Sequence, residues 1–569
     1  MNRLIANIVF LLLPVIILAQ GVKRYDVVIT EFMADPTPVN GLPNNEWIEI
    51  KNVSAVPVNV QGWRIGDATS LSGELPFYIL QPDSMVIICT NSAVNALSVY
   101  GNVIPVTSFP SLDNNGDQVF LKTADGVVIH GIEFTLDWYG NALKQEGGWC
   151  LEMIDPKNAC AGNVNWKASI NPVGGTPGSV NSVNGVLSNL ESAWLNRAYT
   201  EDNLNVVLVF DNAVDSISAS LQSNYQVDNG QVISAKTIEP LFNRVQLTFN
   251  QPMVPGNIYT ITANNIRDCH GQPVSLPDEI KVGITEEASP MDLVINEIMF
   301  NPRSNANDYI EIYNRGQKLV DASALFIANR NSAGAISAAR QISDQPYLIF
   351  PGDHIVVTTD LQNLQLNYLV KNPGSVIILP TLPSYPDDEG HVLLLKKQGE
   401  IVDEVNYNQK WHFKLIDNTE GVSLERIDPE SGSQQENNWQ SAASTAGYGT
   451  PTYINSQFQQ PGIPGFEITV VPKIFSPDND GHDDFTMINY FLGEPGYVAN
   501  VIIYDAAGRP VKHLVKNGTL SQQGSWKWDG LNNDNQSLPV GNYIILTEVF
   551  NLQGLKKKYR NVVVLARRL

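Results

Sequence analysis

The chain repeats part of itself, and this repeat constrains the fold more than any other feature. The segment VVITEFMADP at 27–36 returns as LVINEIMFNP at 293–302, and NEWIEIKN at 45–52 returns as NDYIEIYN at 307–314. Three further pairs follow in the same order: GWCLEMIDP and GVSLERIDP, ending at Pro156 and Pro429; Asn165-Trp166 and Asn438-Trp439; and Thr176-Pro177 and Thr450-Pro451. The spacing between partners drifts, as loops of unequal length would cause. We therefore predict two copies of one domain, a first copy over 22–183 and a second copy over 290–457.

The matched segments have the pattern of β-strands. In EWIEIK, Ile48 and Ile50 alternate with Trp47, Glu49 and Lys51, a period of two that predicts one buried and one exposed face. QVFLKTADGVVIHGIEF at 118–134 predicts a hairpin that turns at Asp125-Gly126. With 42 Gly and 34 Pro spread between short apolar runs, the composition also favours sandwiches joined by many turns.

These segments resemble the lamin tail domain. The resemblance is carried by the opening strands with Ile29 and Glu31, the EWIEI strand, the L-E-x-I-D-P turn and the closing N-W and G-T-P segments, and it covers both copies nearly end to end. It implies an immunoglobulin-like β-sandwich. It implies little about function, because such domains serve as binding or packing modules beside varied partners.

A different pattern of strands fills the stretch between the copies. LNVVLVFDNAVD, VQLTFNQPM and IYTITANNIRDCHG alternate and end in turn residues. The order resembles the Ig-like domains of bacterial surface-layer proteins, which implies a spacer domain over 188–284. The turn from Asp268 to Gly271 holds Cys269 and His270, and a plain turn is favoured there over a metal pair.

The last block begins after a Pro- and Gly-rich linker at 458–465. Residues 466–569 resemble the C-terminal sorting domain of gliding-motility-associated proteins, through Phe475-Ser476-Pro477, Asp480-Gly481, and Trp528-Asp529-Gly530 followed by Gly541 and Tyr543. Asn479 and Asn535 stand where that family commonly has Gly. The resemblance implies recognition by the type IX secretion machinery. The expected fold is thus all-β, with four tandem immunoglobulin-like sandwiches.

The first residues have the features of a signal peptide over 1–19. Arg3 precedes an apolar run from Ile8 to Leu18 that is too short to span a bilayer, and no later segment is long and apolar enough to do so. Cleavage would leave a secreted or cell-surface protein, associated with the outer membrane. The net charge of −22 argues against nucleic acid or anionic lipid as a partner and allows divalent cations.

Two acidic turns are candidate Ca²⁺ sites, since carboxylates crowded about a Gly turn supply the oxygen ligands that Ca²⁺ prefers. One gathers Asp478, Asp480, Asp483 and Asp484 around Gly481, without the spacing of an EF-hand. The other contains Asp113 and Asp117. Solvated or turn-capping carboxylates are the alternative at both places.

Export permits disulfides, and the chain has four cysteines. Cys150 and Cys160 flank a single turn, so a local bridge between them is predicted, although spacing alone does not prove it. Cys89 lies in an apolar run and is expected to be a buried small hydrophobe. Cys269 has no obvious partner.

No sequence motif indicates catalysis. The recurring pairs Glu31 with Glu49, and Glu297 with Glu311, could act as acid and base, but structural hydrogen bonding at a strand edge is the better interpretation because no histidine or nucleophile lies nearby. Trp47 and Trp138 could stack on sugars, although core packing is commoner. We therefore predict a non-catalytic secreted or cell-surface protein for adhesion, scaffolding or ligand binding, with surface glycans or other envelope proteins as possible partners. The alternatives are a carbohydrate-binding accessory protein of polysaccharide degradation and a hydrolase with an unrecognised site.

Overall fold

The computed structural model describes residues 21–188, 192–275, 279–459, 465–478 and 480–567. The predicted signal peptide lies outside these residues, as does most of the predicted linker. The described part is almost entirely β-structure, and every sheet takes its strands from a single predicted domain. None of its helices is long and apolar enough to cross a membrane. The all-β prediction is confirmed.

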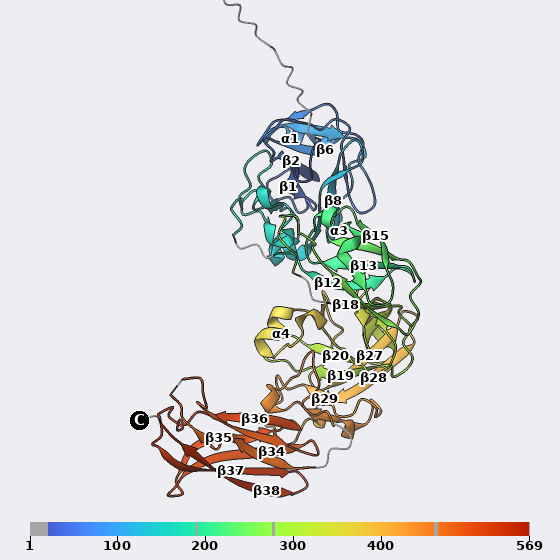
Figure 1. Cartoon of the computed structure of the whole chain (residues 1–569). Helices are drawn as coiled ribbons and strands as arrows, with labels where there is room; N and C mark the ends of the chain where they lie inside the picture. The colour runs from blue at the N-terminus through green and yellow to red at the C-terminus, as the bar shows by residue number, and fades with distance from the viewer. Residues whose placement is uncertain (1–20, 189–191, 276–278, 460–464, 479, 568–569) are drawn as a thin grey trace, which may run out of the picture. The chain divides into compact units, whose positions relative to one another are not determined.

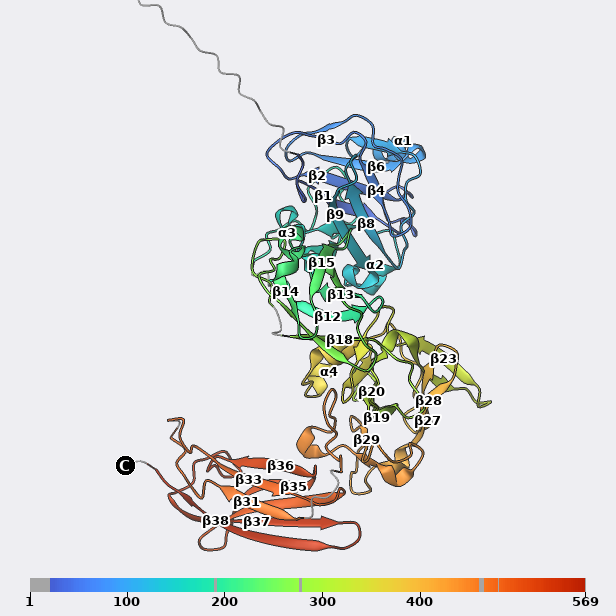
Figure 2. The same cartoon turned by 45° about the vertical axis from the view of Figure 1, so that its right-hand side comes forward.

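The first copy consists of a six-stranded sheet and a smaller three-stranded sheet (Figures 1 and 2). The large sheet has the order β11-β10-β1-β2-β6-β7, with β1 Val27–Met33, β2 Trp47–Asn52, β6 Met85–Thr90, β7 Val103–Val106, β10 Leu151–Met153 and β11 Trp166–Ala168. The small sheet has the order β4-β8-β9, with β4 Arg64–Gly66, β8 Gly116–Lys122 and β9 Val128–Thr135. Two short strands, β3 Val58–Asn59 and β5 Ile79–Leu80, pair beside them.

The second copy has the same strand order. Its large sheet runs β26-β25-β20-β19-β29-β30, with β19 Leu293–Met299, β20 Tyr309–Asn314, β25 His354–Thr358, β26 Val376–Ile378, β29 Leu424–Arg426 and β30 Trp439–Ser441. Its other sheet runs β23-β22-β27-β28, with β22 Leu325–Arg330, β23 Ile336–Gln341, β27 Glu389–Lys396 and β28 Ile401–Asn408. The register of β1 against β2 shifts between Ile29 and Glu31, and that of β19 against β20 shifts between Ile295 and Glu297. The bulge is therefore repeated together with the sequence.

The EWIEI strand departs from the expected pattern of one buried and one exposed face. Trp47 and Glu49 are as fully buried as Ile48 and Ile50, and only Lys51 in this stretch is partly exposed. Ile48 and Ile50 belong to the main core between the sheets. Trp47 belongs to a second apolar cluster with Leu42, Cys89 and Leu97. The sheet is covered on both faces, which alternation within one strand cannot reveal.

The stretch between the copies forms two small sheets that face each other as a sandwich. One has the order β12-β13-β16-β15, with β12 Leu195–Thr200, β13 Asn205–Phe210, β15 Val232–Thr237 and β16 Arg244–Phe249. The other has the order β14-β17-β18, with β14 Tyr225–Val227, β17 Ile258–Ala263 and β18 Ile280–Gly283.

The C-terminal block is a two-layer sandwich with its own core around Trp528, Tyr543 and Ile503 (red in Figure 1). One layer is β31-β33-β36, with β31 Glu467–Val471, β33 Thr486–Phe491 and β36 Gln523–Trp528. The other is β32-β38-β37-β34-β35, with β32 Ile474–Phe475, β34 Tyr497–Asp505, β35 Pro510–Thr519, β37 Gly541–Asn551 and β38 Lys556–Leu565. Asn535 has a φ of 58°, so it holds the left-handed turn at a position where Gly is common.

The chain divides into two compact units. The first contains the first copy and the chain up to Arg197, together with 204–251 and 260–280. The second contains 198–203, 252–259 and the chain from Lys281 on, which includes the second copy and the C-terminal block.

Candidate functional site

The recurring glutamates form a buried row across the large sheet of each copy. In the first copy, Glu31 of β1 is paired across the sheet with Glu49 of β2 on one side and with Glu152 of β10 on the other. Cross-strand partners point to the same face, so the three carboxyl groups lie side by side. All three residues are fully buried. Buried carboxyl groups need hydrogen-bond donors, and the sheet has already used its own backbone donors.

The donors come from the segment that closes the domain. The backbone N–H of Thr176 donates to Glu31 (N to Oε1 2.7 Å), and that of Gly178 donates to Glu49 (N to Oε2 2.7 Å). The hydroxyl of Thr176 donates to Glu152 (3.0 Å), and the hydroxyl of Ser182 donates to the other oxygen of Glu152 (2.7 Å). The G-T-P segment is thus fastened over the sheet by three carboxyl groups.

The second copy repeats this arrangement. Glu297 is paired with both Glu311 and Glu425, and all three are fully buried. Thr450 N donates to Glu297 Oε1 (2.9 Å), and Thr450 Oγ1 donates to Glu425 Oε1 (2.9 Å). Thr452 N donates to Glu311 Oε2 (2.6 Å). The predicted structural hydrogen bonding is confirmed, because the glutamate oxygens accept hydrogen bonds from the closing segment. Its predicted place at a strand edge is wrong, because the strands of Glu31 and Glu297 are paired on both sides.

The glycine of the G-T-P segment is required by the close approach to the glutamates. A Cβ added to Gly175 would lie 2.6 Å from Glu31 Oε1 and 2.6 Å from Cys150 Sγ, and one added to Gly449 would lie 2.7 Å from the Tyr309 hydroxyl. Glu152 and Glu425 were not singled out from the sequence. The signal was present, since both are the glutamate of the repeated L-E-x-I-D-P turn.

Burial shifts the ionisation of these carboxyl groups. Loss of solvent raises the pKa of Glu31 well above its usual value, reinforced by the neighbouring Glu49. The same effect raises the pKa of Glu49 to about 7, that of Glu297 to about 7 and that of Glu425 to about 8. The unfolded chain releases these protons at its ordinary, lower pKa, so unfolding releases protons wherever the pH lies between the two values.

Both copies are therefore expected to become less stable as the pH rises. Groups whose pKa is raised by folding add stability that is complete below about pH 4.5 and is lost as the pH passes through about 7 to 8. Calorimetry of the full chain should give a lower melting temperature at about pH 8 than at about pH 5. Glu425→Gln, which cannot ionise, should flatten this slope for the second copy. A melting temperature that rises over the same interval would contradict the account.

The structure corrects the predicted disulfide. Cys160 is bonded to Cys269, 109 residues away, whereas Cys150 and Cys89 are free and buried. Cys150 occupies the position of Ser423, whose hydroxyl donates to Glu297 (2.5 Å), and the Cys150 thiol likewise donates to Glu31. The Cys150 thiol is therefore a hydrogen-bond donor to the buried glutamates and is not part of a disulfide. The prediction of a Cys150–Cys160 bridge is wrong, and the prediction that Cys89 is buried is confirmed.

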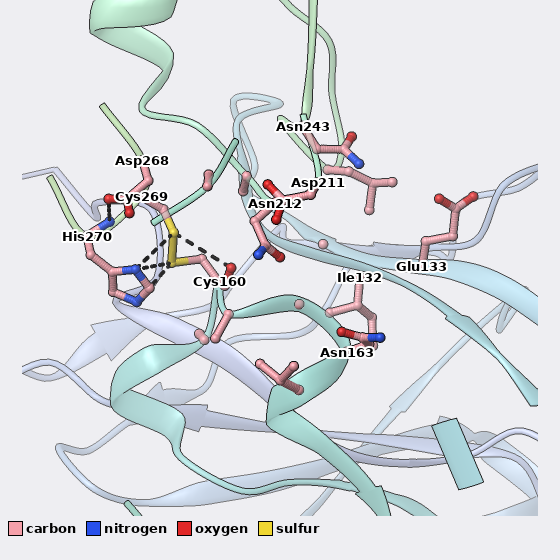
Figure 3. Close-up of a pocket in the computed structure, with 18 of the residues that line it drawn as sticks. Ile132, Glu133, Cys160, Asn163, Asp211, Asn212, Asn243, Asp268, Cys269 and His270 are labelled. Carbon is pink, nitrogen blue, oxygen red and sulfur yellow. Dashed lines mark hydrogen bonds between the residues drawn. A yellow bond between two sulfur atoms is a disulfide. The ribbon is translucent and has the colours of Figure 1, made fainter. Parts of the chain in front are cut away.

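The disulfide lies at a hollow between the first copy and the 188–284 domain (Figure 3). The hollow measures about 700 Å³ and is lined by Trp138, Glu133 and Asn163 from the first copy and by Asn212 and Asn243 from the other domain. His270 Nε2 is 3.5 Å from Cys160 Sγ. Because both sulfurs are bonded to each other, Cys160, Cys269 and His270 do not form an open metal site.

The two candidate tryptophans have different surroundings. Trp47 is fully buried and cannot reach a sugar, so its predicted binding role is wrong. Trp138 is half-buried. Its ring lies beside that of Trp166, with ring centroids 6.1 Å apart, and it also lines the hollow. Of the predicted binding residues, only Trp138 is available to a ligand.

The acidic turns are only partly assembled as predicted. Carboxyl oxygens of Asp478, Asp480 and Asp484 lie within 4.8 Å of one another, while Asp483 lies beside the ring of His482 (3.5 Å). Asn479 lies outside the described residues. Three carboxylates suit Ca²⁺ in kind but fall short of the six to eight oxygens that it usually takes. Ca²⁺ binding at this turn stays a prediction.

At the other turn the two aspartates cap the backbone. Asp117 accepts from the N–H groups of Gln118 (2.7 Å) and Asp113 (3.0 Å). Asp113 accepts from the N–H of Asn115 (3.0 Å). Within the described residues this pair belongs to no cluster of three potential metal ligands. The geometry matches the turn-capping alternative, and Ca²⁺ binding here also stays a prediction.

Comparison with known families agrees with the repeat. The family model of the Lamin Tail Domain matches residues 23–135 and 286–409. Each copy matches the lamin tail domain. The two matches contain β1, β2 and the β8–β9 hairpin of the first copy and their counterparts in the second. No curated protein matches the chain.

The similarity to solved structures is weak. The S-layer protein rSbsC(31-844) is 9% identical over 66% of this chain and 55% of its own length, with a TM-score of 0.16. A DUF4876 family protein from Bacteroides thetaiotaomicron is 12% identical over 43% of this chain and 89% of its own, with a TM-score of 0.18. The Bacteroides ovatus protein SGBP-B, solved with a mixed-linkage heptasaccharide, is 10% identical over 90% and 92%, with a TM-score of 0.16. This chain spans 40% of the N-terminal part of SbsC. Scores this low carry no argument about function.

Proposed function

We propose that this chain is a non-catalytic secreted or cell-surface protein whose sandwich domains hold a ligand or a partner. One observation carries the proposal. The acidic residues that recur in both lamin-tail copies, and that could have formed paired active sites, are buried and accept hydrogen bonds from the closing segment of their own domain. A general acid or base must reach a substrate proton, and these carboxyl groups do not face solvent.

The disulfide supports a location outside the cytoplasm. Cys160 and Cys269 belong to different domains and are joined across 109 residues. Such bonds persist in oxidising compartments and are rare where thiols are kept reduced. This is consistent with export by the N-terminal signal peptide and with delivery by type IX secretion through 466–569.

Deleting 466–569 tests the delivery. The truncated protein should accumulate in the periplasm, while the full chain should be digested by protease added to intact cells. A matched deletion of 188–284 keeps the C-terminal block and should still reach the surface. Normal surface exposure of the chain lacking 466–569 would exclude the sorting role.

A further inference from the structure

The hollow beside the disulfide has the size of a ligand site. Its volume of about 700 Å³ falls within the range of about 300–1,000 Å³ that small-molecule sites occupy. It lies wholly within the first compact unit, between the first copy and the 188–284 domain. Neither the glutamate rows nor the acidic turns contribute to it.

Two walls of amide side chains face the hollow (Figure 3). Asn212 follows β13 and Asn243 precedes β16, and these strands are paired, so both amides stand at one end of the same sheet. The backbone N–H of Phe210 donates to the carbonyl of Asn243 (2.8 Å), which holds this end together. Across the hollow stand Ile132 of β9 and Asn163 of the 3-10 turn Gly162–Asn165.

The lining chemistry fits a polyhydroxylated ligand. Each asparagine offers both a donor and an acceptor, as each sugar hydroxyl also does. Trp138 supplies an aromatic ring with an apolar face and a polar edge, suited to the C–H face of a pyranose. The lining residues that the structure describes include three carboxylates, Glu133, Asp211 and Asp268, and one histidine, His270, but no lysine or arginine, so an anionic ligand would meet net repulsion.

The two domains that line the hollow are joined at several points. Besides the disulfide, the Arg24 guanidinium of the first copy lies over the Phe242 ring, 3.7 Å from its centroid. Lys122 forms an ion pair with Glu239 (3.8 Å). Gly162 has a φ of 63°, and a Cβ there would lie 2.3 Å from Asn212 Oδ1, so its absence lets the two walls approach. A preformed site spares a ligand the cost of ordering its walls.

We propose that this hollow binds a neutral saccharide, with Asn212, Asn243 and Asn163 bonding its hydroxyls and Trp138 packing on its apolar face. This rests on the proposed function and narrows it to a ligand class and a place. The second copy has an equivalent pair, Trp411 and Trp439, with centroids 6.3 Å apart, but the hollow beside it is lined by Lys410 and Lys414. The saccharide site is thus assigned to the first copy alone.

A panel of neutral gluco-, manno-, galacto- and xylo-oligosaccharides, screened on the full chain and measured by calorimetric titration, tests the proposal. We expect at least one to bind with a Kd below about 1 mM. The Asn212→Ala/Asn243→Ala variant should weaken it at least about tenfold. Asn264→Ala, an exposed asparagine of the same domain outside the hollow, should leave the affinity within about twofold.

Trp138→Ala and Trp411→Ala form a second matched pair, since each removes one ring of an equivalent tryptophan pair. Only Trp138→Ala should weaken binding. Binding of no neutral saccharide, or equal binding by the double asparagine variant, would overturn the proposal. The protease test on intact cells is read independently, so failure of the saccharide site and failure of the surface role are distinguishable.

Discussion

Replacing Glu297 with alanine is expected to lower the free energy of unfolding of the second copy by at least about 3 kcal/mol. Glu297 Oε1 accepts from the Tyr309 hydroxyl (2.6 Å), the Ser423 hydroxyl (2.5 Å) and the Thr450 N–H (2.9 Å). All these donors are buried, so truncation leaves them without their acceptor and opens a cavity between the sheet and the closing segment.

The loss of local stability in the Glu297→Ala variant should be greatest in the closing segment, where its backbone donates to the buried glutamates. Hydrogen exchange of the full chain, followed by mass spectrometry, should show the amides of 450–457 exchanging at least about a hundredfold faster in the Glu297→Ala variant. Glu436→Ala removes an exposed glutamate from the same copy and should leave exchange unchanged. Unaltered protection of 450–457 in Glu297→Ala would mean that the glutamate row does not hold this segment.

Removing the disulfide is expected to have the second large effect. The Cys160→Ser/Cys269→Ser variant should lose about 3 kcal/mol from the first compact unit, since the bond closes a loop of 109 residues in the unfolded chain. Chemical denaturation of the full chain measures this loss. Because Cys150 and Cys89 are free and buried, the remaining thiols offer no replacement bond while the protein is folded.

Reductant provides the matched control for the disulfide. It should destabilise the unaltered chain to about the level of the double variant and have no further effect on the double variant itself. Equal sensitivity of both proteins to reductant would place the stabilising bond elsewhere. A double variant as stable as the unaltered chain would show that the disulfide does not stabilise the first compact unit.

The repeat made much of the fold predictable. Matched segments in fixed order predicted two copies, and the shared strand order and the bulge before Glu31 and Glu297 follow from that match. The structural role of the glutamates was predictable because identical acids recurred without a nucleophile nearby. The donors in the closing segment were not, since that segment lies far along the chain and is brought back over the sheet by tertiary folding.

Other features depended on contacts that a linear pattern does not contain. The bridge from Cys160 to Cys269 joins two domains, so local spacing favoured the wrong partner. Trp47 was expected to be accessible because it alternates with core residues, but a second apolar cluster covers its face of the sheet.

One exchange between the copies shows how the same position is filled differently. The N–H of Ile29 donates to the ring of His130 (3.0 Å), whereas the N–H of Ile295 donates to Asp403 (2.8 Å). Asp403 is in turn paired with the buried Arg426 (3.1 Å). The sequences of the two copies differ at both positions, with Met153 in place of Arg426 and His130 in place of Asp403, but they do not show that the two charged groups meet.

Mapping the cysteines in protein recovered from the surface of its native cells tests the central claim most directly. The chain would be alkylated before unfolding, digested without reduction and analysed by mass spectrometry. If the protein is exported and a disulfide joins its first copy to the 188–284 domain, we expect one linked peptide pair, Cys160 with Cys269, and free thiols at Cys89 and Cys150. Four free thiols, a Cys150–Cys160 link, or absence of the chain from the cell surface would contradict it.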